Sequence, residues 1–305
     1  MVSFWYYLRL IRSTFFQKPQ RFQAPTVGYA IGVRDKIAIV TGGNAGIGLE
    51  TVRHLAALGM TVIIGCRDKG KGERAARLLQ EQEAGRTLSI HVAELDLSDL
   101  GNVTKFANYV KHFLNGKPLD LLVNNAGVMH IPHTLSKQGH ELQFAVNYLG
   151  HFHLTKLLLP NMKSPGGRVV FVNAELHTLA NDATPDYAYK GKGDQGYCRS
   201  KLAGVWNAYE LQRRRPDLVV PVLHPGVIAT NLADAPWWLK RLLFITPREG
   251  AQTTLYCCLD EDVKGLTYYH NALGMVPSSK ASYDQQRAAA MWELSEQLTK
   301  PFNDL

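Results

Sequence analysis

The stretch that most constrains this chain runs from Thr41 to Gly48 and reads Thr-Gly-Gly-Asn-Ala-Gly-Ile-Gly. It follows a short, β-branched apolar run at 36–40, which predicts a buried strand of a parallel sheet. It precedes residues 49–58, whose apolar side chains recur at helical spacing up to Gly59. The glycines therefore lie on a strand-to-helix turn.

Such a turn has the properties of an anion site. Glycine adopts backbone angles that other residues avoid, and it lets a phosphate approach the backbone closely. The helix N-terminus adds N–H groups and a partial positive charge. An ordinary tight turn is the alternative. We expect a dinucleotide pyrophosphate to be held by Gly42, Asn44, Gly46, Ile47 and Gly48.

Length and composition favour one large α/β domain. The chain has 305 residues, of which 46% are hydrophobic, enough for a full core. Its four cysteines lack metal-ligand spacing, so no metal site is predicted, and free thiols in a reducing compartment are expected.

The net charge of +8 is unevenly spread. Residues 1–34 hold five basic side chains and no acidic one, so they supply +5 of the total. The rest is only mildly basic, and nucleic-acid binding is not needed to explain the charge. A nicotinamide dinucleotide phosphate or an anionic membrane surface is a sufficient partner.

The N-terminal segment at 4–16 is aromatic, apolar and basic. It is too short, and too interrupted by Arg9 and Arg12, to span a bilayer. It favours an interfacial membrane anchor, with a helix packed on the protein's own surface as the alternative. Residues 17–34 indicate a linker, so we divide the chain into 1–34 and a domain at 35–305.

Strands and helices alternate along the domain, which predicts a doubly wound parallel sheet of the Rossmann type. Ligands of such sheets bind at the carboxyl ends of the strands. The expected strands are 36–41, 61–65, 89–94, 119–123, 168–172 and 218–223, and the expected helices are 46–58, 70–83, 99–114, 138–162 and 195–214, with a loop at 175–194.

Several motifs in order resemble those of the classical short-chain dehydrogenases/reductases, over about residues 36–260. These are 41–48, Asp96, Asn124-Asn125-Ala126-Gly127, Asn147, Tyr197 with Lys201, and the run from Pro225 to Thr230. Three further runs, at 150–152, 249–253 and 294–296, are similar to the retinol-dehydrogenase-like branch. The resemblance implies an oxidoreductase acting on CH–OH groups, and the family often forms homodimers.

Tyr197 and Lys201 are the expected catalytic pair. They are four residues apart on a predicted helix and share one face, although this spacing is also common on plain helix surfaces. A free phenol has a pKa of about 10, and a nearby ammonium lowers it. The resemblance makes Tyr197 the general acid/base and gives Lys201 a bond to the nicotinamide ribose. It assigns a relay water to Asn147, for which a local helix hydrogen bond is the alternative.

Cofactor choice depends on the residue after the second strand. An acidic residue there repels a 2′-phosphate, whereas Arg67 can bind one in a bidentate way. We predict NADP, with NAD left open because Asp68 follows. The resemblance implies cofactor contacts also for Asp96, Asn124, Gly127, Pro225 and Thr230, besides Tyr197 and Lys201. Thr41 is expected to make a structural bond in the turn.

One departure from the family concerns the serine that bonds the substrate oxygen. That position falls on Ala174, whose methyl group donates no hydrogen bond. Losing one such donor costs about 100- to 1000-fold in rate. We expect the amide of Asn173 to supply the donor; otherwise the protein is a catalytically impaired, dinucleotide-binding regulatory or interaction protein.

The substrate side is expected at about 231–247, where Trp237 and Trp238 precede Lys240 and Arg241. This amphipathic lid, with a core-packed helix as its alternative, suits a bilayer interface. It favours a lipophilic alcohol or carbonyl of the retinoid, sterol or isoprenoid class. We expect a membrane-associated, intracellular enzyme; the endoplasmic reticulum, a lipid droplet and a mitochondrion are not distinguished.

Overall fold

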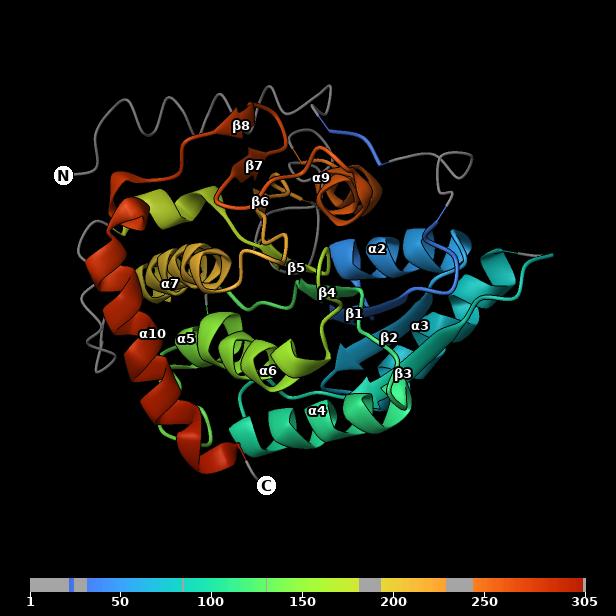
Figure 1. Ribbon diagram of the computed structural model, residues 1–305, viewed down its shortest axis with the longest axis horizontal. Coiled ribbons are helices and arrows are strands. Elements are labelled where there is room, and N and C mark those ends of the chain that lie inside the picture. Colours follow the sequence, from blue (N-terminus) through green and yellow to red (C-terminus); the bar gives the residue numbers. More distant parts are fainter. Residues whose placement is uncertain are drawn as a thin grey trace.

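The computed structural model describes residues 22–24, 32–83, 85–129, 131–180, 193–228 and 244–303. Its centre is an eight-stranded sheet in the order β3-β2-β1-β4-β5-β6-β7-β8, parallel except for β8 (Figure 1). The order reverses between β1 and β4, as in Rossmann-type sheets, which confirms the predicted fold. The strands are β1 Ile37–Thr41, β2 Thr61–Cys66, β3 Ile90–Glu94, β4 Leu121–Asn124, β5 Arg168–Val172, β6 Val222–His224, β7 Tyr268–His270 and β8 Gly274–Val276.

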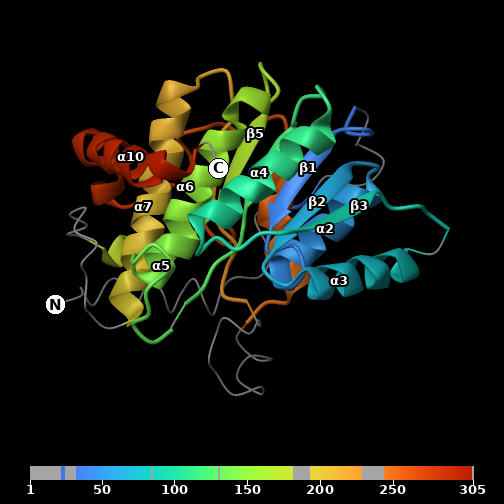
Figure 2. The same ribbon diagram turned by 90° about the horizontal axis from the view of Figure 1, so that it is seen from below.

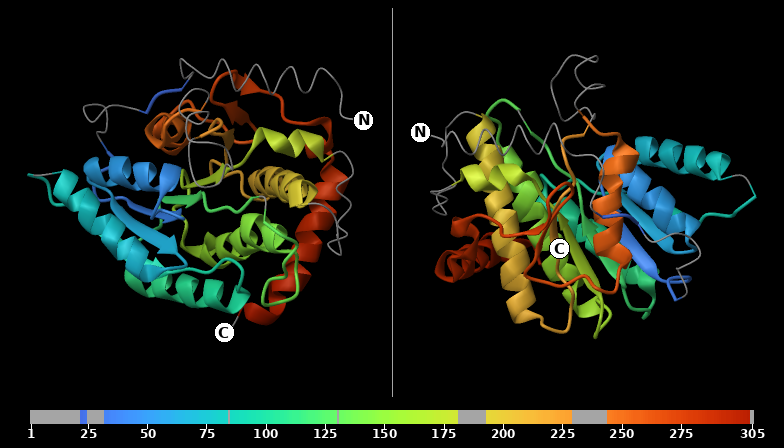
Figure 3. Two further views of the ribbon diagram at one scale, coloured as in Figure 1. Left: turned by 180° about the vertical axis from the view of Figure 1, so that it is seen from behind. Right: turned by 90° about the horizontal axis from the view of Figure 1, so that it is seen from above.

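Helices cover both faces of the sheet, because alternate strand residues point to opposite sides (Figures 1 and 2). One face packs on α4 Leu100–Leu114, α6 Gly150–Leu158 and α7 Gly193–Arg214, with α10 Gln285–Thr299 packed against α6 and α7. The other face packs on α2 Gly46–Ala57, α3 Lys69–Gln82 and α9 Pro247–Leu259. Of these, α2 and α9 lie side by side (Figure 3).

The helix expected at 138–162 is broken into several pieces. It begins as the single turn α5 Leu142–Phe144, continues as the π-helix η2 Ala145–Leu149 and becomes α6. The chain then forms the short 3₁₀ turn η3 Leu159–Asn161, which contains Pro160. The π segment contains Asn147, and such segments frequently occur at functional sites.

Two further segments differ from the expectation. The sixth strand covers Val222–His224 rather than 218–223, because Pro221 has no N–H to donate to a neighbouring strand. The start of the expected loop at 175–194 forms a 3₁₀ helix, η4 Glu175–Leu179. The remaining short helices are η5 Lys280–Tyr283 and η6 Lys300–Phe302.

Most of the expected membrane and substrate elements lie outside the described residues. These are the anchor at 4–16, most of the linker, the later part of the 175–194 loop, Thr230, Trp237 and Trp238. Within the described part of the chain, no helix has the length and apolarity needed to cross a bilayer. Phe22, the first described residue, is buried against Tyr256 and Tyr269, with ring centroids 4.7 and 5.4 Å away.

Candidate active site

The glycine turn forms an open cradle at the N-terminus of α2. Gly42 and Gly46 have φ angles of +66° and +57°, a region that L side chains rarely adopt. A Cβ on Gly48 would lie 2.5 Å from the carbonyl oxygen of Gly42. Ala45 caps the helix without a side-chain bond, so the first-turn N–H groups keep their capacity for an anion. The turn therefore fits a dinucleotide pyrophosphate.

Thr41 joins this turn to the segment after β4. Its hydroxyl oxygen accepts the N–H groups of Asn125 and Ala126, both at 2.9 Å, and lies 2.9 Å from Nε2 of His151. The other nitrogen of His151 lies 3.4 Å from the carbonyl oxygen of Asn147, so Nδ1 carries the ring proton and Thr41 donates to Nε2. Burial lowers the pKa of His151 to about 3, which keeps the ring neutral. Thr41 thus makes structural bonds, as expected, but to the segment after β4 and to α6 rather than within the turn.

The other expected cofactor residues lie along the same carboxyl edge of the sheet. Arg67 is exposed after β2, and Asp68 caps α3 through the N–H of Lys71. Asp96, after β3, accepts the N–H and hydroxyl of Ser98 with one carboxylate oxygen. Asn124 turns inward instead and donates to the hydroxyl of Thr155 at 3.0 Å.

Gly127 and Pro225 complete this edge. A Cβ on Gly127 would lie 3.3 Å from Oδ1 of Asn147 and 3.7 Å from Nζ of Lys201, so this glycine borders two of the residues predicted to be catalytic. Pro225 is buried after β6, and the chain then leaves the described region at Ile228. The described chain resumes at position 244, and Ile245, within the expected lid, bridges to Ile228 just before it.

Tyr197, Lys201 and Asn147 come together, all buried, between α7 and η2. Nζ of Lys201 lies 5.5 Å from the ring centroid of Tyr197 and donates to the carbonyl of Val172 at 3.2 Å. Asn147 binds both backbone groups of Val128, at 2.8 and 2.9 Å. It also donates to Ser200, whose hydroxyl in turn donates to the carbonyl of Tyr197.

Burial dominates the electrostatics of the pair. It lowers the pKa of Lys201 to about 8 and raises the pKa of Tyr197 above its ordinary value. The second shift is opposite to the lowering by Lys201 that we expected from the sequence. The reason is that burial removes water from the phenol, and the neighbouring Cys198 adds a smaller effect in the same direction.

The amide of Asn173 does not face the substrate side, in contrast to the expectation. Its nitrogen donates to the carbonyl of Lys201 at 2.9 Å, and its oxygen accepts the N–H of Ala174 at 2.7 Å. The side chain thus fastens the end of β5 to α7. A Cβ on Gly204 would lie 2.8 Å from the same nitrogen, so a glycine on α7 makes room for it.

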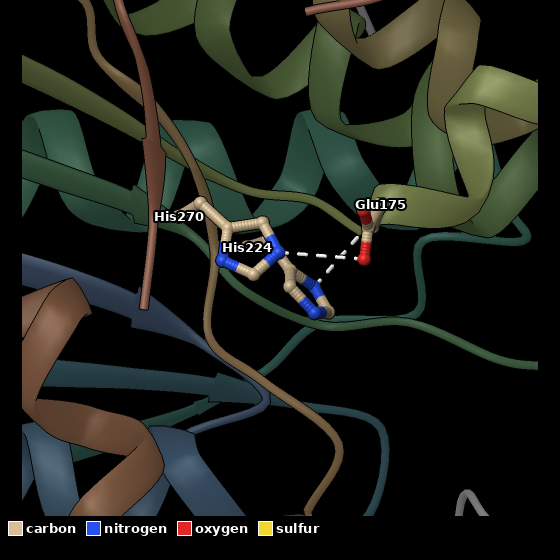
Figure 4. A group of neighbouring side chains, drawn as sticks. All are labelled: Glu175, His224 and His270. Carbon is tan, nitrogen blue, oxygen red and sulfur yellow. Dashed lines mark hydrogen bonds and ion pairs between the residues drawn. The ribbon is translucent and has the colours of Figure 1, made fainter. Parts of the chain in front are cut away.

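A buried polar cluster at the ends of three strands was not found from the sequence. It comprises Glu175 after β5, His224 on β6 and His270 on β7 (Figure 4). Nε2 of His270 lies 3.3 Å from a carboxylate oxygen of Glu175, and the backbone N–H of Glu175 donates to Nδ1 of His224 at 3.3 Å. The signal that could have revealed the cluster is that each residue ends a strand, or closely follows one, at the carboxyl edge.

The hydrogen bonds of this cluster favour bound protons over a metal ion. The three residues each offer one ligand atom within 4.8 Å of the others. However, Nδ1 of His270 accepts the N–H groups of Ala272 and Leu273, so the ring proton lies on Nε2 and points to Glu175. A metal bound at Nε2 needs the proton on Nδ1, facing a second-shell acceptor rather than two N–H donors.

Comparison with known proteins decides the family. The family model for short chain dehydrogenases matches residues 36–236. The chain belongs to the short-chain dehydrogenase family. Its relatives in the retinol-dehydrogenase-like branch confirm the predicted placement, and it is therefore a dehydrogenase that acts on CH–OH groups.

Three similar proteins illustrate this placement of the short-chain dehydrogenase. Mouse retinol dehydrogenase 14 is 37% identical, over 86% of this chain and 85% of its own length. Human polyprenol dehydrogenase is 36% identical, over 87% and 85%. The crystal structure of an uncharacterised protein from Mycobacterium paratuberculosis is 35% identical, covers 91% of this chain and 98% of its own, and has a TM-score of 0.75.

Replacing Thr41 by valine should lower the free energy of unfolding by about 2–4 kcal/mol. Valine has the same shape but leaves the partly buried N–H groups of Asn125 and Ala126 without an acceptor, at about 1–3 kcal/mol each. Urea denaturation of the cofactor-free protein measures the change. Thr41→Ser is the matched control, since it keeps the hydroxyl, and it should cost no more than about 1 kcal/mol. Equal losses in the two variants would contradict the role of the hydroxyl.

The buried ammonium of Lys201 should make stability rise with pH. The lysine pKa is about 8 when folded and 10.5 in the unfolded chain, so the unfolded state holds more protons between these values. Relative to Lys201→Met, the free energy of unfolding of the wild type should increase by about 2 kcal/mol from pH 8 to pH 10. Urea denaturation at several pH values measures the difference. A flat or falling difference would show that Lys201 is not desolvated.

Proposed function

We propose that this protein is an NADP(H)-preferring oxidoreductase that interconverts a lipophilic alcohol and its carbonyl. The observation that carries the proposal is the junction of Tyr197, Lys201 and Asn147 beside Gly127, at the sheet edge where the glycine turn lies. The names of the relatives, retinol dehydrogenase and polyprenol dehydrogenase, support a substrate of the retinoid, sterol or isoprenoid class.

In this mechanism Tyr197 exchanges a proton with the substrate oxygen. The ammonium of Lys201 lies 5.5 Å from the ring centroid of Tyr197, is held by the carbonyl of Val172, and would stabilise negative charge on the phenol. Asn147 positions Tyr197, because Ser200 links the Asn147 side chain to the backbone of Tyr197. A bound nicotinamide cofactor supplies or accepts the hydride.

Arg67 supports a preference for NADP over NAD. It is exposed at the end of β2, where a guanidinium can bind a 2′-phosphate. The sequence left NAD open because Asp68 follows Arg67. In the structure the Asp68 carboxylate caps α3 by accepting the backbone N–H of Lys71. The glycine turn, Arg67 and Asp96 would then hold the cofactor, with Tyr197, Lys201 and Thr230 at its nicotinamide end.

A membrane-associated location agrees with the nature of the substrate. Residues 1–34 combine aromatic and basic side chains, and the lid at about 231–247 repeats this composition. The described residues on either side of positions 229–243 meet at the carboxyl edge, where Ile228 bridges to Ile245.

A catalytically impaired, dinucleotide-binding protein is the second candidate. Two observations favour it. Ala174 has no hydrogen-bond donor in its side chain, and the amide of Asn173 is already bonded to the backbone of Lys201 on α7. The two candidates share cofactor binding and differ in turnover.

Tyr197→Phe is the test of the proposed function. The substitution removes only the phenolic oxygen, so turnover of retinal or a long-chain isoprenoid aldehyde should fall by at least about 100-fold. Fluorescence titration should show an unchanged dissociation constant for NADPH, tighter than that for NADH. Turnover retained in the variant would refute the role of Tyr197, and cofactor binding without any turnover in the wild type would favour the second candidate.

A further inference from the structure

The site lacks a neutral hydrogen-bond donor where the family resemblance places a serine. Position 174 carries a methyl group, and the neighbouring amide of Asn173 is bonded to the backbone of α7 and to the N–H of Ala174. A carbonyl that receives hydride develops negative charge on its oxygen, and a second donor beside the tyrosine stabilises it. A residue on a neighbouring strand would have to supply this second hydrogen bond to the substrate oxygen.

His224 lies next to this position. Strands β5 and β6 pair with Val172 opposite Leu223, and the N–H of Asn173 donates to Leu223. His224 is therefore beside Asn173 at the carboxyl edge. Side chains alternate along a strand, so His224 shares the face of Val222, which packs in the core cluster formed with α7. Tyr197 and Lys201 lie on that helix.

The hydrogen bonds of His224 fix where its proton lies. The backbone N–H of Glu175, directly after Ala174, donates to Nδ1 at 3.3 Å, so Nδ1 is an acceptor and Nε2 carries the hydrogen. The second nitrogen of the ring points away from Glu175 (Figure 4). Within the described ranges this N–H makes no hydrogen bond, whereas the corresponding group of His270 is bonded to Glu175.

The surroundings keep the ring neutral. Burial, together with the neighbouring His270, His177 and Lys201, lowers the pKa of His224 to about 3, against an opposing contribution from Glu175. The ring also remains 7% exposed, whereas His270 is fully buried. A neutral imidazole with a fixed N–H is a suitable electrophile for a carbonyl oxygen, as in triosephosphate isomerase.

We propose that the Nε2–H of His224 donates to the substrate oxygen the hydrogen bond that the serine hydroxyl would give. The inference rests on the proposed function. In the reduction, hydride from the nicotinamide cofactor forms the C–H bond, the carbonyl π bond breaks, and Tyr197 delivers the proton to the oxygen. His224 keeps its proton throughout and stabilises the charge that develops. The site then has its second donor although position 174 is an alanine.

A pair of amide substitutions separates the donor from the rest of the ring. His224→Asn places an amide oxygen where Nδ1 lies, which preserves the bond from Glu175, and removes the Nε2–H. His224→Gln places an amide N–H near Nε2 instead. We expect kcat to fall about 100-fold in the first variant and less than about 10-fold in the second, with the NADPH dissociation constant unchanged. Wild-type kcat in His224→Asn would overturn the proposal.

Restoring the serine gives a test that does not depend on the stability of one variant. Ala174→Ser should change kcat little in the wild type, because a donor is already present, and should recover at least about 10-fold in His224→Asn. The same gain in both backgrounds would overturn the proposal. His270→Gln is the matched control from the same polar cluster, and it should keep kcat near that of the wild type.

The tautomer of His224 can be tested by NMR without measuring enzyme activity. Long-range ¹H–¹⁵N NMR of the protein should show His224 with an unprotonated Nδ1 and a protonated Nε2 from pH 6 to pH 8. The opposite tautomer, or titration in that range, would overturn the proposal. If the wild type binds NADPH but turns over no carbonyl, the proposed function fails; if it turns over and His224→Asn is unchanged, only the role of His224 fails.

Discussion

The arrangement of the site depends on the hydrogen bonds that the hydroxyl of Thr41 makes. One oxygen accepts two N–H groups from the segment after β4 and donates to His151, so it joins β1, β4 and α6. The other ring nitrogen of His151 bonds to the carbonyl of Asn147 in the π-helical turn. Asn147 in turn holds Val128 and Ser200, next to Tyr197. The glycine turn and α7, which carries the proposed catalytic pair, are therefore parts of one hydrogen-bonded frame.

This frame keeps charged and polar groups in a dry place. Lys201 is buried, its ammonium donates to the backbone carbonyl of Val172, and this burial lowers its pKa to about 8. Electrostatic interactions are stronger where water is excluded, so an ammonium here acts strongly on any negative charge that develops nearby. Burial of this lysine lowers the free energy of unfolding, since a desolvated cation disfavours the folded state at neutral pH. The cluster of Glu175, His224 and His270 continues the polar layer along the next two strand ends.

The fold and the outline of the site could be predicted from the sequence. The glycine turn, the alternation of strands and helices, and the spacing of Tyr197 and Lys201 are local patterns, and the topology then places them at one edge. The break at η2 could not be predicted, because residues 142–158 have the apolar character of one long helix and the π turn depends on contacts of Asn147 with Val128.

Other features could not be predicted because they depend on contacts distant in sequence. The orientation of Asn173 is set by the backbone of Lys201 on α7, which no strand pattern shows. The pKa of Tyr197 is set by burial, whereas helical spacing reveals only the neighbouring charge. Glu175, His224 and His270 meet because β5, β6 and β7 are adjacent, and the last of these strands was not recognised in the sequence.

The most direct test of the central claim is transfer of deuterium from NADPH labelled at C4 of its nicotinamide, with the label on the transferred face. The wild-type protein is incubated with labelled NADPH and a lipophilic aldehyde, and the alcohol is analysed by mass spectrometry. The structure predicts one deuterium at the carbinol carbon with the wild type and no labelled alcohol with Tyr197→Phe. Bound NADPH without labelled alcohol, across retinoid, sterol and isoprenoid carbonyls, would contradict the assignment of this site as a working dehydrogenase.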